Sequence, residues 1–242
     1  MSAESLTPLY FNLFLAAAAR KIMQSQAIIF REANRPSLES VTLPPQQATD
    51  VTIEIHYSGI SAGTETSIIS GTRTHNGTFP LVSGYMAAGE IQFVGSEVKG
   101  FTAGDRVVSW GSRLNSVNSV WGAHMAHHVC DSASVTHVPD SVNLWDAAAW
   151  VPPRVGLNAV EVSAVSKDDI VLVSGQGVIG FFFAQWARMR GARVVALEPD
   201  PKRSDMARSL ADIIVIDPTQ GDLDENILVA CGEGTRFLDG FE

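Results

Sequence analysis

Three glycines, at positions 175, 177 and 180, have the G-x-G-x-x-G spacing and stand between an apolar run and a segment of helical character. In a dinucleotide-binding turn, Gly175 permits a tight turn, Gly177 lets the backbone approach a pyrophosphate, and Gly180 lets the helix pack closely on the strand. The helix start supplies free N–H groups to the phosphates. The spacing predicts a nucleotide site, with glycines needed only for packing as the alternative. The intervening residues are also expected to contact the cofactor: Gln176, Val178 and Ile179.

An acidic residue, Glu198, ends the next apolar run after the glycines. A carboxylate at this position accepts hydrogen bonds from both hydroxyls of a ribose and repels a 2′-phosphate, which favours NAD over NADP. Lys202 and Arg203 follow closely, and a basic side chain there can accommodate a 2′-phosphate. We therefore expect NAD, with NADP less favoured, and we include Arg203 among the cofactor-binding residues.

The elements that must position these residues alternate along the C-terminal part of the chain. Apolar runs at 170–174, 193–197 and 213–216 predict strands, and the segments between them have helical spacing. Such alternation is typical of a parallel sheet. Before them, Pro152 and Pro153 divide an alanine-rich segment into two expected helices.

Residues 24–139 have a different texture, with short β-rich segments separated by Gly, Pro, Asn and Ser. This spacing predicts an all-β barrel or sandwich-like domain. One expected strand, 122–131, carries three histidines. On a strand, His124 and His128 would share a face while His127 points the other way, so a metal site stays open as an alternative to partly buried histidines.

Composition limits the class of protein. The chain has 242 residues, 45% of them hydrophobic and 18% charged, which fits one large or two ordinary globular domains. The net charge of −9 argues against nucleic acid and against an anionic membrane surface as partners. The two cysteines, Cys130 and Cys231, form no CxxC pair, so we expect a reducing cytoplasm.

The first 22 residues contain an apolar stretch, Leu9–Lys21, that needs its own interpretation. It lacks a basic region before it and is too short to span a bilayer. We interpret residues 1–22 as a dispensable extension or the product of an upstream start, with a signal peptide as the alternative. The expected domains are then residues 23–150, all-β, and residues 151–242, a partial NAD(P)-binding unit.

The two parts together resemble the medium-chain dehydrogenase/reductase superfamily, which includes the zinc alcohol dehydrogenases. The resemblance covers about residues 24–218 and is carried by four segments: SGISAGTE (58–65), 79–111, 122–143 and the glycine motif. The run G-x-x-V-x-G-F-x-x-G-D-R-V within them is especially specific. The resemblance implies an α/β chain with an N-terminal all-β part, namely a GroES-like β domain followed by an incomplete Rossmann-like parallel sheet, with the active site in the cleft between the two domains.

The departures from the zinc-dependent members concern the metal ligands. Where those members carry Cys and Gly-His-Glu, this chain has Ser61 and then Gly84, Tyr85 and Met86, and a third ligand position falls near Arg154. The four-cysteine lobe for structural zinc is absent from the sequence. Zinc needs about three protein ligands in a catalytic site. The sequence therefore predicts no metal.

Without zinc, a positioned acid–base group must move the substrate proton. The resemblance implies that Tyr85, in place of the zinc histidine, faces the cleft and donates to a carbonyl or hydrogen-bonds an alkoxide. Thr64 stands where a hydroxyl relays the proton, Glu65 orients the loop or acts as base, and Arg154 stabilises an oxyanion. The alternatives are packing for Tyr85, helix capping for Thr64 and Glu65, and a surface ion pair for Arg154. The motif also resembles the branch that contains bacteriochlorophyllide dehydrogenase.

The expected function is NAD(P)-dependent, zinc-independent hydride transfer with an alcohol/carbonyl or enone substrate. The remaining strands of a complete Rossmann sheet are not in the sequence, so we expect a truncated chain, and a homo-oligomer where the full sheet is present. A partial sheet leaves its edge and apolar helix faces uncovered. Two alternatives remain: a catalytically silent nucleotide-binding member, and a non-functional fragment.

Overall fold

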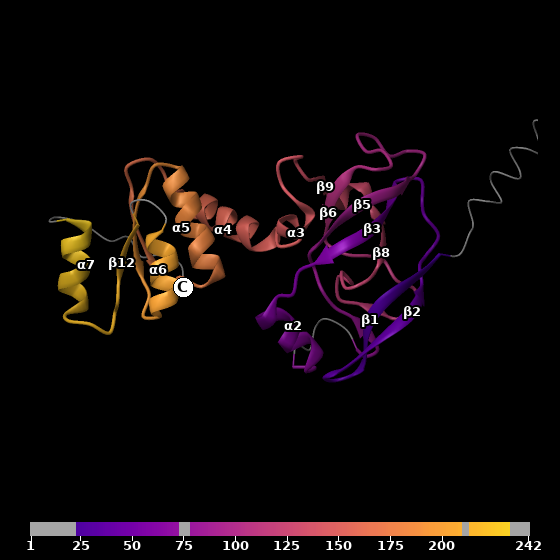
Figure 1. Cartoon of the computed structure of the whole chain (residues 1–242), viewed down its shortest axis with the longest axis horizontal. Helices are drawn as coiled ribbons and strands as arrows, with labels where there is room; N and C mark the ends of the chain where they lie inside the picture. Colours follow the sequence, from indigo (N-terminus) through magenta and orange to yellow (C-terminus); the bar gives the residue numbers. More distant parts are fainter. Residues whose placement is uncertain (1–22, 73–77, 210–212, 233–242) are drawn as a thin grey trace, which may run out of the picture. The chain divides into compact units, whose positions relative to one another are not determined.

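The computed structural model describes residues 23–72, 78–209 and 213–232. It divides into two compact units, residues 1–149 and residues 150–242, which are described separately below (Figure 1). The expected N-terminal extension, residues 1–22, lies outside the described residues. Among the described residues, no helix is long and apolar enough to cross a membrane.

The larger sheet of the N-terminal unit has the strand order β8-β3-β5-β6-β9, and every neighbouring pair is antiparallel. Along β3, Val51 and Ile53 are fully buried and belong to one core cluster with Ile91 of β5 and Val107 of β6. Burying these β-branched residues on one face fixes the register of the sheet. The strands are β3 (Asp50–Ser58), β5 (Ala87–Val94), β6 (Arg106–Ser109), β8 (His127–Asp131) and β9 (Val135–His137).

A second sheet in the same unit has the order β2-β1-β4-β7. Its core includes Ile29 and Val82, which pack with Val129 of β8, so the two sheets share one hydrophobic interior. The strands are β1 (Gln24–Glu32), β2 (Arg35–Thr42), β4 (Leu81–Val82) and β7 (Asn118–Ser119). Helical segments of this unit are α2 (Ala62–Ile69), η1 (Ser132–Ser134) and α3 (Leu144–Ala147).

The C-terminal unit is built on a parallel sheet of order β10-β11-β12. The central strand buries alternate residues on opposite faces, because successive side chains of a strand point to opposite sides. Val194 packs with Ala184 of α5, whereas Val195 packs with Ala230 of α7. The elements are α4 (Val151–Val162), β10 (Ile170–Ser174), α5 (Val178–Met189), β11 (Arg193–Leu197), α6 (Pro201–Arg208), β12 (Ile213–Ile216) and α7 (Leu223–Cys231).

The expected fold class, an all-β part followed by a parallel Rossmann-like sheet, is confirmed. The two helices separated by Pro152 and Pro153 are present as α3 and α4, with the prolines in the first turn of α4. The strand expected at 122–131 is wrong over its first half. The backbone of residues 123–126 bonds instead to Gly84, Ser83 and Gln26, with only an isolated bridge between Met125 and Ala27, and β8 begins at His127, where pairing with β3 starts.

Candidate functional site

The glycine turn between β10 and α5 has the geometry that the sequence predicts. Gly175 has a φ of +82°, a conformation that L side chains rarely adopt. A Cβ added to Gly180 would lie 2.1 Å from the carbonyl oxygen of Gly175, so only glycine allows α5 to start this close to the turn. Gly177 is the N-cap residue of α5, and no side chain caps the first turn of the helix.

The space in front of this turn suits a phosphate group. A Cβ built on Gly175 or on Gly177 meets no atom within 4 Å, so nothing in the described part of the unit fills that space. The first two residues of α5, Val178 and Ile179, are exposed, and the Gln176 Oε1 atom is buried without a hydrogen-bond partner in the described residues. An uncapped helix start with open space before it has the free N–H groups that an anion could bind.

Glu198 follows β11 and is tied to the glycine turn. Its side chain is buried, and each carboxylate oxygen accepts one backbone N–H at 2.8 Å, from Gln176 to Oε2 and from Asp200 to Oε1. The exposed guanidinium of Arg203 lies 4.0 Å from Oε2. Glu198 therefore fixes the loop that would hold the cofactor, and its contact with a ribose stays a prediction.

The N-terminal unit contains a buried acid–base pair. His124 Nε2 lies 2.6 Å from Glu65 Oε2, and the two side chains come from the segment before β8 and from the first turn of α2. Glu65 also accepts the backbone N–H of Ser61 at 2.9 Å and the hydroxyl of Ser83 at 3.2 Å. Burial by itself raises the pKa of Glu65, but the hydrogen bond and charge of His124, with the Ser61 and Ser83 donors, outweigh it and hold this pKa below its ordinary value.

The other ring nitrogen of His124 contacts Ser58 at the end of β3. Ser58 Oγ lies 2.9 Å from His124 Nδ1, and Ser58 is exposed although His124 and Glu65 are buried. Close packing makes this cluster compact, because a Cβ on Gly84 would lie 2.8 Å from the His124 ring. Three segments that are distant in sequence thus meet here: 58–65, 83–86 and 122–124.

Of the expected catalytic residues, Glu65, Thr64 and Tyr85 all belong to these segments. Thr64 is half-buried in α2, where its carbonyl accepts the Ser67 hydroxyl. Tyr85 is half-buried next to Gly84, and its ring packs edge-on against Trp121 at 5.3 Å. Arg154 lies exposed on α4 in the C-terminal unit. The roles of all four residues stay predictions.

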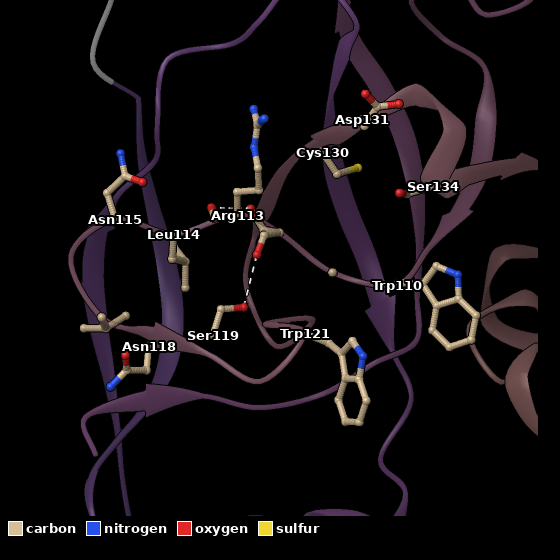
Figure 2. Close-up of a pocket in the computed structure, with 13 residues that line it drawn as sticks. Trp110, Arg113, Leu114, Asn115, Asn118, Ser119, Trp121, Cys130, Asp131 and Ser134 are labelled. Atoms are coloured by element: carbon tan, nitrogen blue, oxygen red, sulfur yellow. Dashed lines mark hydrogen bonds between the residues drawn. The ribbon is translucent and has the colours of Figure 1, made fainter. Parts of the chain in front are cut away.

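A pocket of about 650 Å³ opens beside Trp121 in the N-terminal unit (Figure 2). Trp110 and Trp121 supply indole rings to its wall, and Leu114 and Val117 supply apolar side chains. None of the expected catalytic residues lines it. Trp121 connects the two regions, because it lines the pocket and also packs on Tyr85.

The three histidines do not form a metal site. His128 is fully buried in β8, with Nδ1 2.8 Å from Ser109 Oγ and Nε2 3.1 Å from the Ala123 carbonyl, whereas His124 lies before the strand and pairs with Glu65. The described residues contain no group of three His, Cys, Asp or Glu side chains that could hold a metal ion.

This chain is similar in sequence and structure to known dehydrogenases and reductases. Residues 47–140 match the alcohol dehydrogenase GroES-like domain. L-threonine 3-dehydrogenase of Edwardsiella ictaluri is 31% identical over 231 residues, which are 85% of this chain and 66% of the relative. L-idonate 5-dehydrogenase of Vitis vinifera is 30% identical over 215 residues, which are 78% and 58% of the two chains. Escherichia coli quinone oxidoreductase in complex with NADPH superposes with a TM-score of 0.67 at 26% identity over 84% of this chain and 62% of that chain.

The chain belongs to the medium-chain dehydrogenase/reductase superfamily. The resemblance inferred from the sequence is thereby confirmed. The chain spans about half to two thirds of the length of the curated relatives it matches first. The β-rich N-terminal unit is the GroES-like domain of the superfamily, and the β10–β12 unit is the Rossmann-like part.

At the positions where the resemblance to the zinc-dependent members implies metal ligands, this chain has Ser61, Tyr85 and Met86, which carry a hydroxyl, a phenol and a thioether. That the site takes no zinc stays a prediction. The residues that sequence reasoning did not assign to catalysis are His124 and Ser58. Sequence reasoning treated His124 only as one of three histidines of a possible metal site, and Ser58 only as the first residue of the SGISAGTE segment.

Proposed function

We propose that this chain is a zinc-independent, NAD(P)-dependent oxidoreductase that transfers a hydride between the cofactor and an alcohol/carbonyl or enone substrate. The observation that carries the proposal is the turn at Gly175–Gly180, where open space faces an uncapped helix start. A bound nicotinamide nucleotide would supply the hydride donor or acceptor. The pyrophosphate would lie against the N–H groups of Val178 and Ile179.

The proposed substrate-side residues come from the GroES-like unit. Tyr85 would donate a hydrogen bond from its phenol to the substrate carbonyl oxygen, and the edge-on contact with Trp121 holds its ring. Thr64 and Glu65 would support it from α2. Arg154 belongs instead to α4 of the C-terminal unit and would hold an oxyanion or an acidic group of the substrate. Two relatives are named as dehydrogenases of the alcohols L-threonine and L-idonate, and one as a quinone oxidoreductase. These names support both an alcohol and a conjugated carbonyl as the substrate class.

NAD is the cofactor we propose as preferred. Glu198 places a fixed negative charge after β11, which disfavours a 2′-phosphate nearby. Arg203 offsets part of that charge from 4.0 Å, and one structural relative holds NADPH, so NADP is the less favoured choice. We further propose the cytoplasm as location, because both cysteines are free thiols, and a homo-oligomer as the assembled state.

Turnover of the full chain tests the proposal. Deuterated NADH and, separately, deuterated NADPH are mixed with menadione or with cinnamaldehyde, and the absorbance of the reduced nicotinamide is followed. We expect oxidation of NADH with deuterium in the alcohol or reduced enal product, unchanged after dialysis against a chelator. Cofactor oxidation that disappears with chelation and returns with zinc would contradict the zinc-independent mechanism.

A further inference from the structure

Three polar side chains lead from the interior of the GroES-like unit to its surface. Glu65 and His124 are only 6% and 7% exposed, and their closest atoms are 2.6 Å apart. Ser58, at the end of β3, is exposed and places its Oγ 2.9 Å from the remaining ring nitrogen of His124. The chain of contacts is therefore continuous from a buried carboxylate to a serine that is exposed at the surface.

The network fixes where the protons lie. An ionised carboxylate only accepts hydrogen bonds, so in the neutral imidazole the proton is on His124 Nε2 and points at Glu65. His124 Nδ1 then carries a lone pair and accepts the hydrogen of the Ser58 hydroxyl. Glu65 cannot turn away, because Ser61 N–H and the Ser83 hydroxyl hold its two oxygens. A hydroxyl, a base and a group that orients the base are the components of an activated acid–base site.

His128 in the same unit shows what a purely structural histidine looks like here. Its ring nitrogens contact Ser109 Oγ and the Ala123 carbonyl, and both His128 and Ser109 are buried. No carboxylate contacts the His128 ring in the described structure, and its serine does not reach the surface. His124, by contrast, contacts a carboxylate, and its serine is exposed. Proton exchange with a bound molecule requires both features.

We propose that His124 is the acid–base group of this site and that Ser58 carries the proton between His124 and the substrate oxygen. This inference rests on the proposed oxidoreductase function. In alcohol oxidation, the substrate O–H proton moves to Ser58 Oγ while the Ser58 proton moves to His124 Nδ1. The hydride of the carbinol carbon leaves to the oxidised nicotinamide, and the electron pair of the O–H bond forms the carbonyl. Glu65 stabilises the resulting imidazolium, and carbonyl reduction runs in reverse.

A covalent probe tests the activation of Ser58 without any cofactor. The full chain is incubated with a biotinylated fluorophosphonate, and the labelled serine is located by peptide mass spectrometry. Labelling forms the Ser58 Oγ–P bond, releases fluoride and gives the Ser58 proton to His124. We expect Ser58 to be labelled and the rate to fall at least about 10-fold in His124→Gln, because a general base typically contributes 10²–10⁴-fold.

Two further variants keep the test decisive. Glu65→Gln keeps an oxygen acceptor for His124 but removes the charge, so we expect the labelling rate of Ser58 to fall by less than in His124→Gln. This variant keeps His124 in place, so it tests the relay even if His124→Gln folds poorly. His137→Gln replaces an exposed histidine that contacts the Gly100 carbonyl, and it should label like the unmodified chain. An unlabelled Ser58, or labelling that is equal in a folded His124→Gln, would overturn the relay.

A second readout separates the relay from the proposed function. Ser58→Ala should slow menadione or cinnamaldehyde reduction at least about 10-fold while the Kd for NADH is unchanged. Unchanged turnover in Ser58→Ala would overturn the relay. A chain that labels at Ser58 as expected but binds neither NADH nor NADPH would contradict the proposed function and leave the acid–base activation of Ser58 supported.

Discussion

Gln176 donates its backbone N–H to Glu198 Oε2 over 2.8 Å, which links the glycine turn to the end of the neighbouring strand. The other oxygen of the same buried carboxylate accepts the Asp200 N–H. The acidic residue at the end of β11 therefore has a structural task before any ribose reaches it. It holds together the two loops between which the adenosine half of the cofactor would lie.

Glu198→Gln should destabilise the Rossmann-like unit. A glutamine has one carbonyl oxygen for two backbone donors, so one buried N–H faces an amide NH₂ and loses its acceptor. We expect the free energy of unfolding to fall by about 1–3 kcal/mol, measured by urea denaturation. The control Asp205→Asn removes an exposed carboxylate of α6 with an i,i+3 partner and should change stability by less than about 0.5 kcal/mol. Equal effects of the two variants would contradict the account.

Two glycine substitutions should separate folding from binding. Gly180→Ala places a Cβ 2.1 Å from the Gly175 carbonyl, so α5 must shift and both stability and nucleotide affinity should fall. Gly177→Ala meets no protein atom within 4 Å and sits at φ −66°, ψ −179°, which alanine adopts without strain. The free energy of unfolding of Gly177→Ala should lie within about 1 kcal/mol of that of the parent chain.

The affinity of Gly177→Ala is the decisive quantity of that pair. The added methyl group occupies the space where a pyrophosphate approaches the backbone, so we expect the Kd for NADH to rise at least about 10-fold. Isothermal titration calorimetry of the two variants and the parent chain measures this. A Gly177→Ala chain with parental affinity would show that the nucleotide does not bind at this turn.

Tyr85→Phe should lower turnover while nucleotide binding stays intact. Phenylalanine keeps the edge-on contact with Trp121, so the local packing is preserved and only the phenol donor is lost. If Tyr85 donates to the carbonyl in the transition state, kcat should fall about 10²-fold. The parallel substitution Tyr57→Phe alters a tyrosine that packs on Trp145 elsewhere in the unit and serves as the control. If Tyr85→Phe and Tyr57→Phe have the same kcat, Tyr85 only packs and does not donate to the substrate.

His128 should make stability depend on pH in the acid range. Burial lowers its pKa to about 4, helped by the nearby His124 and His127 and opposed by the hydrogen bond to Ala123. The unfolded chain, with a pKa of about 6.5, binds the proton more tightly, so stability is lost as pH falls from about 6.5 to about 4. The full loss is about 3 kcal/mol.

Urea denaturation at several pH values, compared with His128→Gln, measures this contribution. The glutamine keeps one acceptor and one donor in the buried position but binds no proton. We expect a shallower pH dependence in the variant, with the difference confined to the acid window. A parallel pair of curves between pH 6.5 and 4 would show that His128 does not carry the effect.

The sequence predicts local features of this fold well. The strands at 170–174, 193–197 and 213–216 agree residue for residue with β10, β11 and β12, because each is a continuous apolar run bounded by turn residues. The glycine turn was predictable for the same reason, since its three glycines act on neighbouring atoms. The start of β8 was not, because residues 123–126 bond to Gly84, Ser83 and Gln26, which are distant in sequence, before the pairing with β3 begins at His127.

The acid–base cluster could not be predicted in this way. Glu65 and His124 are 59 positions apart in the sequence. They meet because α2 and residues 122–124 both bond to the segment 83–86. The sequence identified Glu65 from its motif and His124 only as one of three histidines. Which histidine faces the carboxylate depends on sheet order and register, and no short-range pattern encodes them.

Nucleotide binding tests the central claim most directly. The full chain is titrated with NADH and, separately, with NADPH, and energy transfer from tryptophan to the reduced nicotinamide is followed, with Gly177→Ala as the control. The account predicts saturable binding of NADH, weaker binding of NADPH, and a rise of at least about 10-fold in the Kd of the control. Two results would contradict this expectation: a folded parent chain that binds neither nucleotide, or a Gly177→Ala variant that binds NADH as tightly as the parent chain does.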